Sequence, residues 1–237
     1  MKSLPMLIIS LFLLALPVEA QPNRFSSTQG FSFAYPEGWV VLTKEQQHVL
    51  VNEYKTVLGK LGDVNFDAMA VIVFNPQNEE FPENINVIVA PGMVPVNEDS
   101  KQKHTQTMSE GMRNAGITVT DTVSEITKFG DREALSLRMT LNYPSLSRPI
   151  RQWQVALPGR NQTYIITASA GAASFQTYEG AFKRALESFE VDGGSFWFWH
   201  SLPAVAQYAI GGAVIGLVIS LLGTLFKKIA GGNGNNQ

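Results

Sequence analysis

The chain of 237 residues contains no cysteine and only three histidines, and its formal net charge is −2. Without cysteine, neither disulfides nor thiol chemistry is available, so an exported domain of this chain must be stabilised by its hydrophobic core. The nearly balanced charge gives no electrostatic basis for nucleic-acid binding, which needs clustered Lys and Arg. Cofactor chemistry is also not expected, because no cofactor-binding motif is present.

Long apolar runs lie at both ends of the chain, and the first has the form of a secretory signal. Lys2 precedes an apolar run over Leu4–Leu16, and small residues ending at Ala20 follow it. This pattern predicts a signal peptide over 1–20, cleaved after Ala20, and then a short linker over 21–29. The alternative is an uncleaved anchor, but in either case the next domain leaves the cytoplasm. No cysteine follows the run, which excludes an acylated lipoprotein anchor.

The second apolar run predicts a transmembrane helix over 201–226. Its residues Leu202–Phe226 include no charged side chain, and a helix of that length reaches about 37 Å, enough to cross a hydrocarbon core of about 30 Å. Aromatic residues in the juxtamembrane linker 193–200 suit the water boundary, and two lysines begin the predicted cytoplasmic tail 227–237. The alternative is a buried helix of a soluble protein. We expect a single-pass protein of a bacterial inner membrane, with its domain on the extracytoplasmic side.

Small residues recur every four positions within this predicted span. They are Gly212, Gly216, Ser220 and Thr224, which lie on one helical face. Small side chains let a second helix approach closely, and hydroxyls can bond across the contact. The pattern therefore favours a homodimer through this helix, although it also arises by chance in spans rich in glycine.

The residues between the two ends, 30–192, predict an α+β domain. Leu135–Asn142 alternates apolar and polar residues with a period of two. Other strand-like runs end at turn residues, and close spacing with short turns favours antiparallel pairing. These runs are Ala70–Phe74, Ile85–Ala90, Trp153–Leu157 and Tyr164–Ala170.

Three helices are expected among the strands. The first begins at Thr43, where Gln46 completes a capping box. The second covers Asp99–Ala115, is largely polar and is expected to be the more exposed one. The third starts near Ser174 and has one apolar face. Helices with an apolar stripe must cover a sheet, which predicts an antiparallel sheet flanked by helices in an α/β/α sandwich.

Two motifs of this domain resemble a known family. The start Gly-Phe-Ser-Phe-x-Tyr-Pro-x-Gly-Trp, over Gly30–Trp39, is similar to the opening hairpin of the PsbP family. The closing helix at Ala185–Val191 resembles that family's end. The resemblance extends to the bacterial DcrB-like proteins and, in fold, to a Ran-binding nuclear-transport protein. It implies a protein-binding α/β/α sandwich with no shared catalytic residues. The predicted membrane span departs from the best-known members, which are soluble or lipid-anchored.

The sequence does not predict an enzyme. Its histidines are His48, His104 and His200, and no two of them have the spacing of zinc ligands. There is no Gly-x-Ser-x-Gly motif to place a nucleophile beside a base. We expect His48 and His104 on the polar sides of their helices, exposed to solvent.

Two charged groups are candidate binding sites. Glu79, Glu80 and Glu83 cluster in one segment and could supply the oxygen ligands that Ca²⁺ prefers, although acidic loops are common without a metal. Arg138, Arg148 and Arg151 lie near one another along the chain and are a candidate basic patch for an acidic partner. The alternative for these arginines is a scattered, solvated face of the sheet.

Two classes of function remain open from the sequence. The first is a membrane-anchored, non-catalytic interaction module that assists the assembly, stability or transport of an envelope complex. The second is a membrane-anchored protein that binds a small ligand or a metal, or a weak hydrolase. A site lined by Glu79, Glu80 or His104 would favour the second class.

Overall fold

The computed structural model describes residues 23–49, 68–78, 82–144 and 146–191. Within these ranges, ten strands form two antiparallel sheets, and helices pack against them, so the predicted α+β class and the antiparallel pairing are confirmed. The larger sheet has seven strands in the order β3-β4-β5-β9-β8-β7-β6. These strands are β3 (Val40–Val41), β4 (Met69–Phe74), β5 (Asn84–Pro91), β6 (Thr118–Phe129), β7 (Arg132–Asn142), β8 (Ile150–Pro158) and β9 (Gln162–Gly171).

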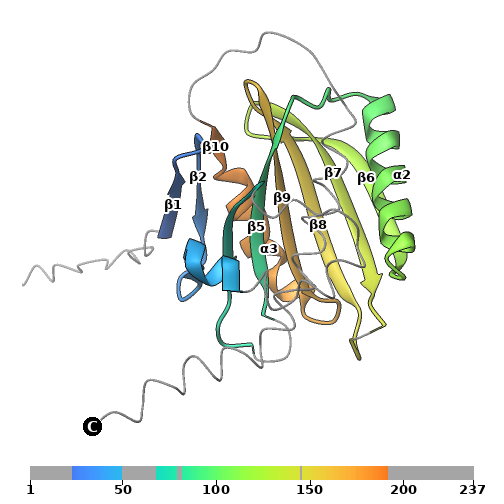
Figure 1. Ribbon diagram of the computed structural model, residues 1–237, viewed down its shortest axis with the longest axis horizontal. Coiled ribbons are helices and arrows are strands. Elements are labelled where there is room, and N and C mark those ends of the chain that lie inside the picture. The colour runs from blue at the N-terminus through green and yellow to red at the C-terminus, as the bar shows by residue number, and fades with distance from the viewer. Residues whose placement is uncertain (1–22, 50–67, 79–81, 145, 192–237) are drawn as a thin grey trace, which may run out of the picture.

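Two helices lie on opposite faces of this sheet, as the predicted sandwich requires. Helix α2 (Glu98–Asn114) runs beside β6, and helix α3 (Phe175–Glu187) lies on the other side against β9 (Figure 1). The side chain of Asn97 caps α2 by accepting from the backbone N–H of Ser100. Helix α2 begins and ends one residue before the predicted bounds.

Each face of the sheet has its own hydrophobic core. The first core lies on the α2 side and includes Met108 and Met112 of that helix with the inward residues of β7. The second core lies on the α3 side and includes Phe175 and Phe182. Because side chains alternate along a strand, each strand contributes to both cores. This explains why β4 is a continuous apolar run in the sequence.

The opening motif forms part of a second, smaller sheet. Strand β2 (Phe31–Tyr35) pairs with β1 (Asn23–Ser27) and with β10 (Glu190–Val191), all antiparallel. The expectation of a linker over 21–29 is therefore wrong for the residues of β1. Phe31 and Phe33 point into the second core, and Gly38 occupies the turn after β2 with a φ of +79°, a conformation that glycine adopts without steric cost.

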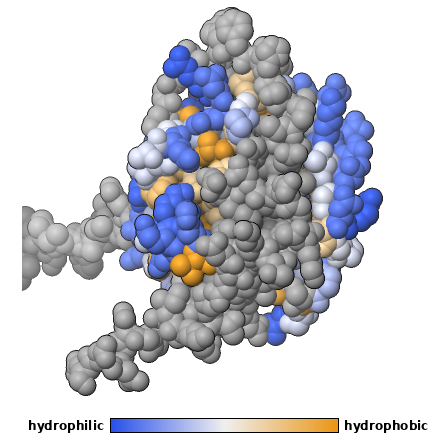
Figure 2. Space-filling view, in the orientation of Figure 1, coloured by the Kyte–Doolittle hydropathy of each residue, from blue (hydrophilic) through white to orange (hydrophobic). Residues whose placement is uncertain are grey.

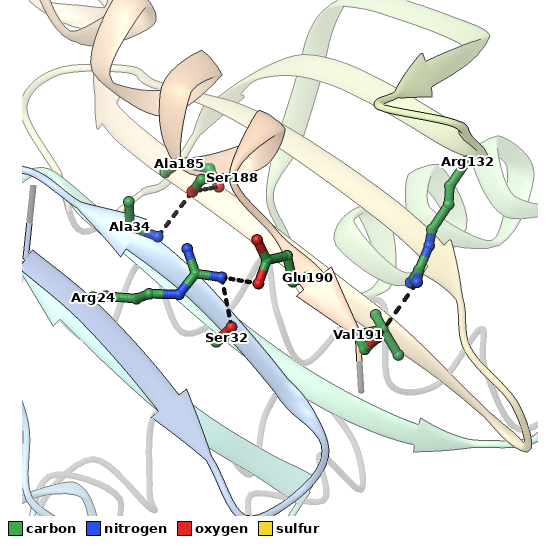
Figure 3. A network of polar contacts seen from close by, with 8 residues as sticks. All are labelled: Arg24, Ser32, Ala34, Arg132, Ala185, Ser188, Glu190 and Val191. Carbon is green, nitrogen blue, oxygen red and sulfur yellow. Dashed lines mark hydrogen bonds and ion pairs between the residues drawn. The ribbon is translucent and has the colours of Figure 1, made fainter. Parts of the chain in front are cut away.

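Polar contacts connect the strands of the small sheet to one another, to the end of α3 and to β7 (Figure 3). Arg24 forms an ion pair with Glu190. The Ser188 hydroxyl accepts from the backbone N–H of Ala34 at 2.8 Å, and Arg132 donates to the carbonyl of Val191 at 3.4 Å. The first and last described strands thus lie on either side of β2, and the Arg24–Glu190 ion pair connects them across it.

The start of the first predicted helix is confirmed, with residues 44–49 helical. The N–H of Gln46 donates to the Thr43 hydroxyl and the N–H of Thr43 donates to the Gln46 side chain, at 3.3 and 2.9 Å. The rest of that helix lies outside the described residues. So do the predicted signal peptide, the predicted span 201–226 and its small-residue face. Within the described ranges, no helix is long and apolar enough to cross a membrane.

Candidate functional site

Six uncharged polar side chains form a compact group on the first-core face of the large sheet. In the strand register, Ser169 of β9 lies opposite Asn84 of β5 on one side and Gln152 of β8 on the other. Two residues along, Thr167 lies between Asn86 and Gln154 in the same way. All six are fully buried. We call these residues the polar grid: Asn84, Asn86, Gln152, Gln154, Thr167 and Ser169.

The polar grid interrupts an apolar face. On β4 its neighbours are Phe74 and Ile72, and on β7 they are Met139 and Leu137. The alternation of the sequence produces this arrangement, because the intervening residues Ile85 and Trp153 point into the second core. Asparagine and glutamine thus occupy positions where a sheet core ordinarily has valine or isoleucine.

His104 also belongs to the first-core side, and the expectation that it would be exposed is wrong. It is 7% exposed and lies one helical turn before Met108 on the buried face of α2. Burial lowers the pKa of His104 to about 4, and a hydrogen-bonding effect of Gln154 in the polar grid opposes this only in part. The imidazole is therefore neutral at pH 7. His48, by contrast, is exposed as expected.

Three buried polar atoms of this region have no hydrogen-bond partner in the part of the chain that the structure describes. They are Asn84 Oδ1, Ser169 Oγ and His104 Nε2. Asn84 uses its amide nitrogen to donate to the carbonyl of Pro82 at 3.1 Å, but its oxygen is not engaged. Native proteins leave few buried polar atoms unsatisfied, so these atoms mark a candidate site.

A second candidate surface is the outer edge of β6. Among the strands that the structure describes, β6 pairs only with β7 and stands at the end of the sheet order. A bulge between Thr120 and Val123, with Asp121 at a φ of +50°, divides the strand. The segment Val123–Phe129 continues in regular register with β7, and the side chain of Val123 is 53% exposed.

A cavity of about 470 Å³ adjoins the start of β6. It lies where the chain passes from the last turn of α2 into the strand, and the exposed Arg113 is the one charged residue among the described residues that line it. Figure 2 shows mostly hydrophilic residues along the side of the molecule where α2 lies. The lining residues are Ser109, Arg113, Gly116, Ile117, Thr118, Val119 and Thr122.

The structure places the side chain of Glu83 in the interior, and the candidate metal site at Glu79, Glu80 and Glu83 stays a prediction. The carboxylate of Glu83 is fully buried and accepts hydrogen bonds from the amides of Asn75 and Asn78 at 2.9 and 2.7 Å. Burial raises the pKa of the nearby Tyr178, and the charge of Glu83 adds to this effect. Glu79 and Glu80 lie outside the described residues, among which no group of three candidate metal ligands occurs.

The three arginines of the predicted patch have different surroundings. Arg138 donates to Glu179 of α3 at 2.7 Å and lies over the ring of Trp153 at 4.0 Å. Arg151 lies over Phe175 at 5.5 Å. Arg148 is exposed and lines a cavity of about 530 Å³ between the β7–β8 and β9–α3 connections. Binding of an acidic partner at these residues stays a prediction.

The comparisons with known proteins concern the fold. The structure is similar to a cyanobacterial PsbP. This protein, from Synechocystis sp. PCC 6803, is 15% identical over 73% of this chain and 93% of its own, with a TM-score of 0.48. LpqN, which is involved in cell envelope biogenesis of Mycobacterium tuberculosis, is 11% identical over 74% of this chain and 88% of its own, with a TM-score of 0.39. No family model and no curated protein matches the sequence. These likenesses concern the fold and assign no function.

Proposed function

We propose that this chain is a non-catalytic accessory protein of the cell envelope, which binds a segment of a partner protein at the edge of β6. The C-terminal apolar segment predicted from the sequence would hold the domain at the extracytoplasmic surface of the membrane. The observation that carries the proposal is the long outer edge of β6, with which no other described strand pairs, and the cavity beside it.

The edge of β6 suits the addition of a partner strand. An edge strand presents backbone N–H and C=O groups that an extended peptide can bind, and a neighbouring pocket supplies specificity for a side chain. The regular segment Val123–Phe129 provides the backbone groups. The cavity beside α2, with Arg113 on its lining, favours a partner segment with an acidic side chain.

The same strand carries features that limit unspecific pairing. Its bulge at Asp121 bends the edge, and Glu125 and Lys128 place charges along it. Natural edge strands use bulges and charges in this way to avoid aggregation. A partner that binds this edge therefore needs a matching segment, which fits a specific accessory role.

A comparison of two exposed valines tests the proposal. Val123 on β6 and Val49 in the first helix are each 53% exposed. Full-length chains that carry Val123→Asp or Val49→Asp would be purified by affinity tag from detergent-solubilised membranes. We expect partner proteins to co-purify with the wild type and the Val49 variant but to be depleted from the Val123 variant. Equal recovery with both variants would contradict docking at β6.

The predicted homodimer through Gly212, Gly216, Ser220 and Thr224 can be tested in the same membranes. Gly216→Ile introduces a bulky side chain on the small-residue face, which should prevent close helix approach. A dimer signal by crosslinking that is unchanged in this variant would remove the prediction.

A further inference from the structure

We propose that the domain stands upright on the membrane, with one end of its sheets against the lipid headgroups and the edge of β6 running away from the bilayer. The end that faces the lipid carries the β1–β2, β6–β7 and β8–β9 turns. We call it the turn end and define it by residues 28–30, 130–131 and 159–161. This inference rests on the membrane anchoring in the proposed function and adds the orientation of the domain, which anchoring alone leaves open.

The strand registers place these three turns at the same end of the molecule. Leu135 lies opposite Ala156, so the start of β7 and the end of β8 lie together, and with them the β6–β7 and β8–β9 turns. The side chain of Gln162, at the start of β9, donates to the carbonyl of Gln29 in the β1–β2 turn at 3.0 Å. The β1–β2 turn therefore lies beside the other two.

The last described residue, Val191, also lies at the turn end. It pairs with Phe31, the first residue of β2, and its carbonyl accepts from Arg132, the first residue of β7, at 3.4 Å (Figure 3). Strand β2 leads away from the β1–β2 turn, and β10 is antiparallel to it. The chain at Val191 therefore runs toward the turn end and leaves the described part of the domain there.

The length of the chain beyond Val191 limits how far the turn end lies from the membrane. Phe196, the first aromatic residue of the predicted juxtamembrane linker, follows Val191 by five residues. Five residues span at most about 18 Å even when fully extended. Strand β7, by comparison, has 11 residues and is about 35 Å long. If the aromatic residues lie at the water boundary as the sequence predicts, this tether brings the turn end close to the headgroups.

The turn end is built to approach a flat surface closely. Its β6–β7 turn has two residues and its β8–β9 turn has three, whereas the β7–β8 connection at the opposite end has seven. The β5–α2 connection is held against the turn end, since the N–H of Gly92 donates to the carbonyl of Asn161 at 3.0 Å. Short turns leave Val191 near the outer limit of the domain, where a short tether can reach the lipid.

The position of the tether, rather than charge, selects this orientation. Attraction to anionic lipid requires clustered basic residues. The exposed charged residues at or beside the β6–β7 and β8–β9 turns have both signs: Lys128, Asp131, Glu133 and Arg160. The orientation is therefore expected in neutral lipid as well.

An upright domain gives the edge of β6 a defined direction. Phe129 adjoins the turn end, and Val123 lies about 20 Å from it along the strand. Thr118, on the lining of the cavity with Arg113, is about 35 Å from Phe129. A partner segment that fills both the edge and the cavity therefore extends away from the bilayer, with its acidic side chain far from the lipid.

The absence of cysteine from the chain allows a single fluorophore to be attached at a chosen position. Arg160→Cys places it in the β8–β9 turn, and Ser147→Cys places it at the opposite end of β8, about 30 Å away along the strand. Both residues are exposed. Asp131→Cys and Asn142→Cys, at the two ends of β7 and also exposed, repeat the comparison on a second strand.

The labelled full chains would be reconstituted into phosphatidylcholine nanodiscs that contain a lipid with a nitroxide quencher on its headgroup. We expect quenching to be several-fold stronger at positions 160 and 131 than at positions 147 and 142. Equal quenching at both ends, which a domain lying on its side would give, overturns the proposal. Stronger quenching at positions 147 and 142, or a contrast that arises only when anionic lipid is added, overturns it as well. A chain that does not incorporate into the nanodiscs contradicts the membrane anchoring of the proposed function, and the orientation with it.

Discussion

Replacing His104 with leucine should remove a large part of the acid sensitivity of the fold. The imidazole is 7% exposed on the inner face of α2, and its pKa is lowered to about 4 by burial. In the unfolded chain the pKa of a histidine is about 6.5. As the pH falls, the unfolded chain therefore binds a proton before the folded chain does. Stability that is fully present above pH 6.5 is lost between about pH 6.5 and pH 4.

The magnitude follows from the two pKa values. Their difference corresponds to about 3 kcal/mol of unfolding free energy, of which about 2.5 kcal/mol is lost by pH 4.5. Carboxylates titrate in the same range, but they are unchanged by the substitution. The difference in acid sensitivity between the wild type and His104→Leu therefore measures the contribution of His104.

Urea unfolding of the full chain in detergent, followed by tryptophan fluorescence, measures this difference at about pH 7.5 and about pH 4.5. Between the two pH values, the free energy of unfolding of the wild type should fall by about 2.5 kcal/mol more than that of His104→Leu. The exposed His48 provides the control, because His48→Leu should behave as the wild type does. If His104→Leu loses as much stability as the wild type, His104 is not a buried neutral histidine and the reasoning fails.

Four further substitutions test the packing. Trp39→Ala should lower the free energy of unfolding by about 3 kcal/mol, because it removes the ring whose centroid lies 6.1 Å from that of Phe182. A change in activity without a change in the urea midpoint would contradict this structural role. Gly38→Ala should lower the free energy of unfolding by about 1 kcal/mol, because Gly38 has a φ of +79°. Gly180→Ala, within α3, should raise the free energy of unfolding by up to about 1 kcal/mol. A higher thermal midpoint for Gly38→Ala than for Gly180→Ala would refute these two assignments. Glu83→Gln should lower the free energy of unfolding by about 2 kcal/mol, because the new amide N–H₂ group would face the amide donor of Asn75 or Asn78. An unchanged urea midpoint would show that the carboxylate of Glu83 is not buried there.

The sequence predicts the central strands well because burial on one or both faces leaves a clear pattern. Leu135, Leu137 and Met139 alternate with polar residues, and the observed β7 includes all of them. The edge strand β6 was missed, because most of its side chains are at least partly exposed and no apolar period appears. Its many threonines and valines were the available signal, since β-branched residues favour strands.

The candidate site was harder to predict than the fold. The polar grid joins Asn84 with Ser169 and Gln152, residues far apart in the chain that only the strand register brings together. The burial of His104 did have a local signal, because His104, Met108 and Met112 recur every four residues along α2. The sequence alone showed the polar composition of this helix but not which of its faces would be covered.

Site-specific photo-crosslinking in intact membranes tests the proposed function most directly. A photoreactive residue would replace Val123 on the edge of β6 or, in a control chain, the equally exposed Val49. The proposal predicts a discrete crosslinked product of one partner from position 123 and none from position 49. No product from position 123, or the same products from both positions, would contradict a partner-binding edge at β6.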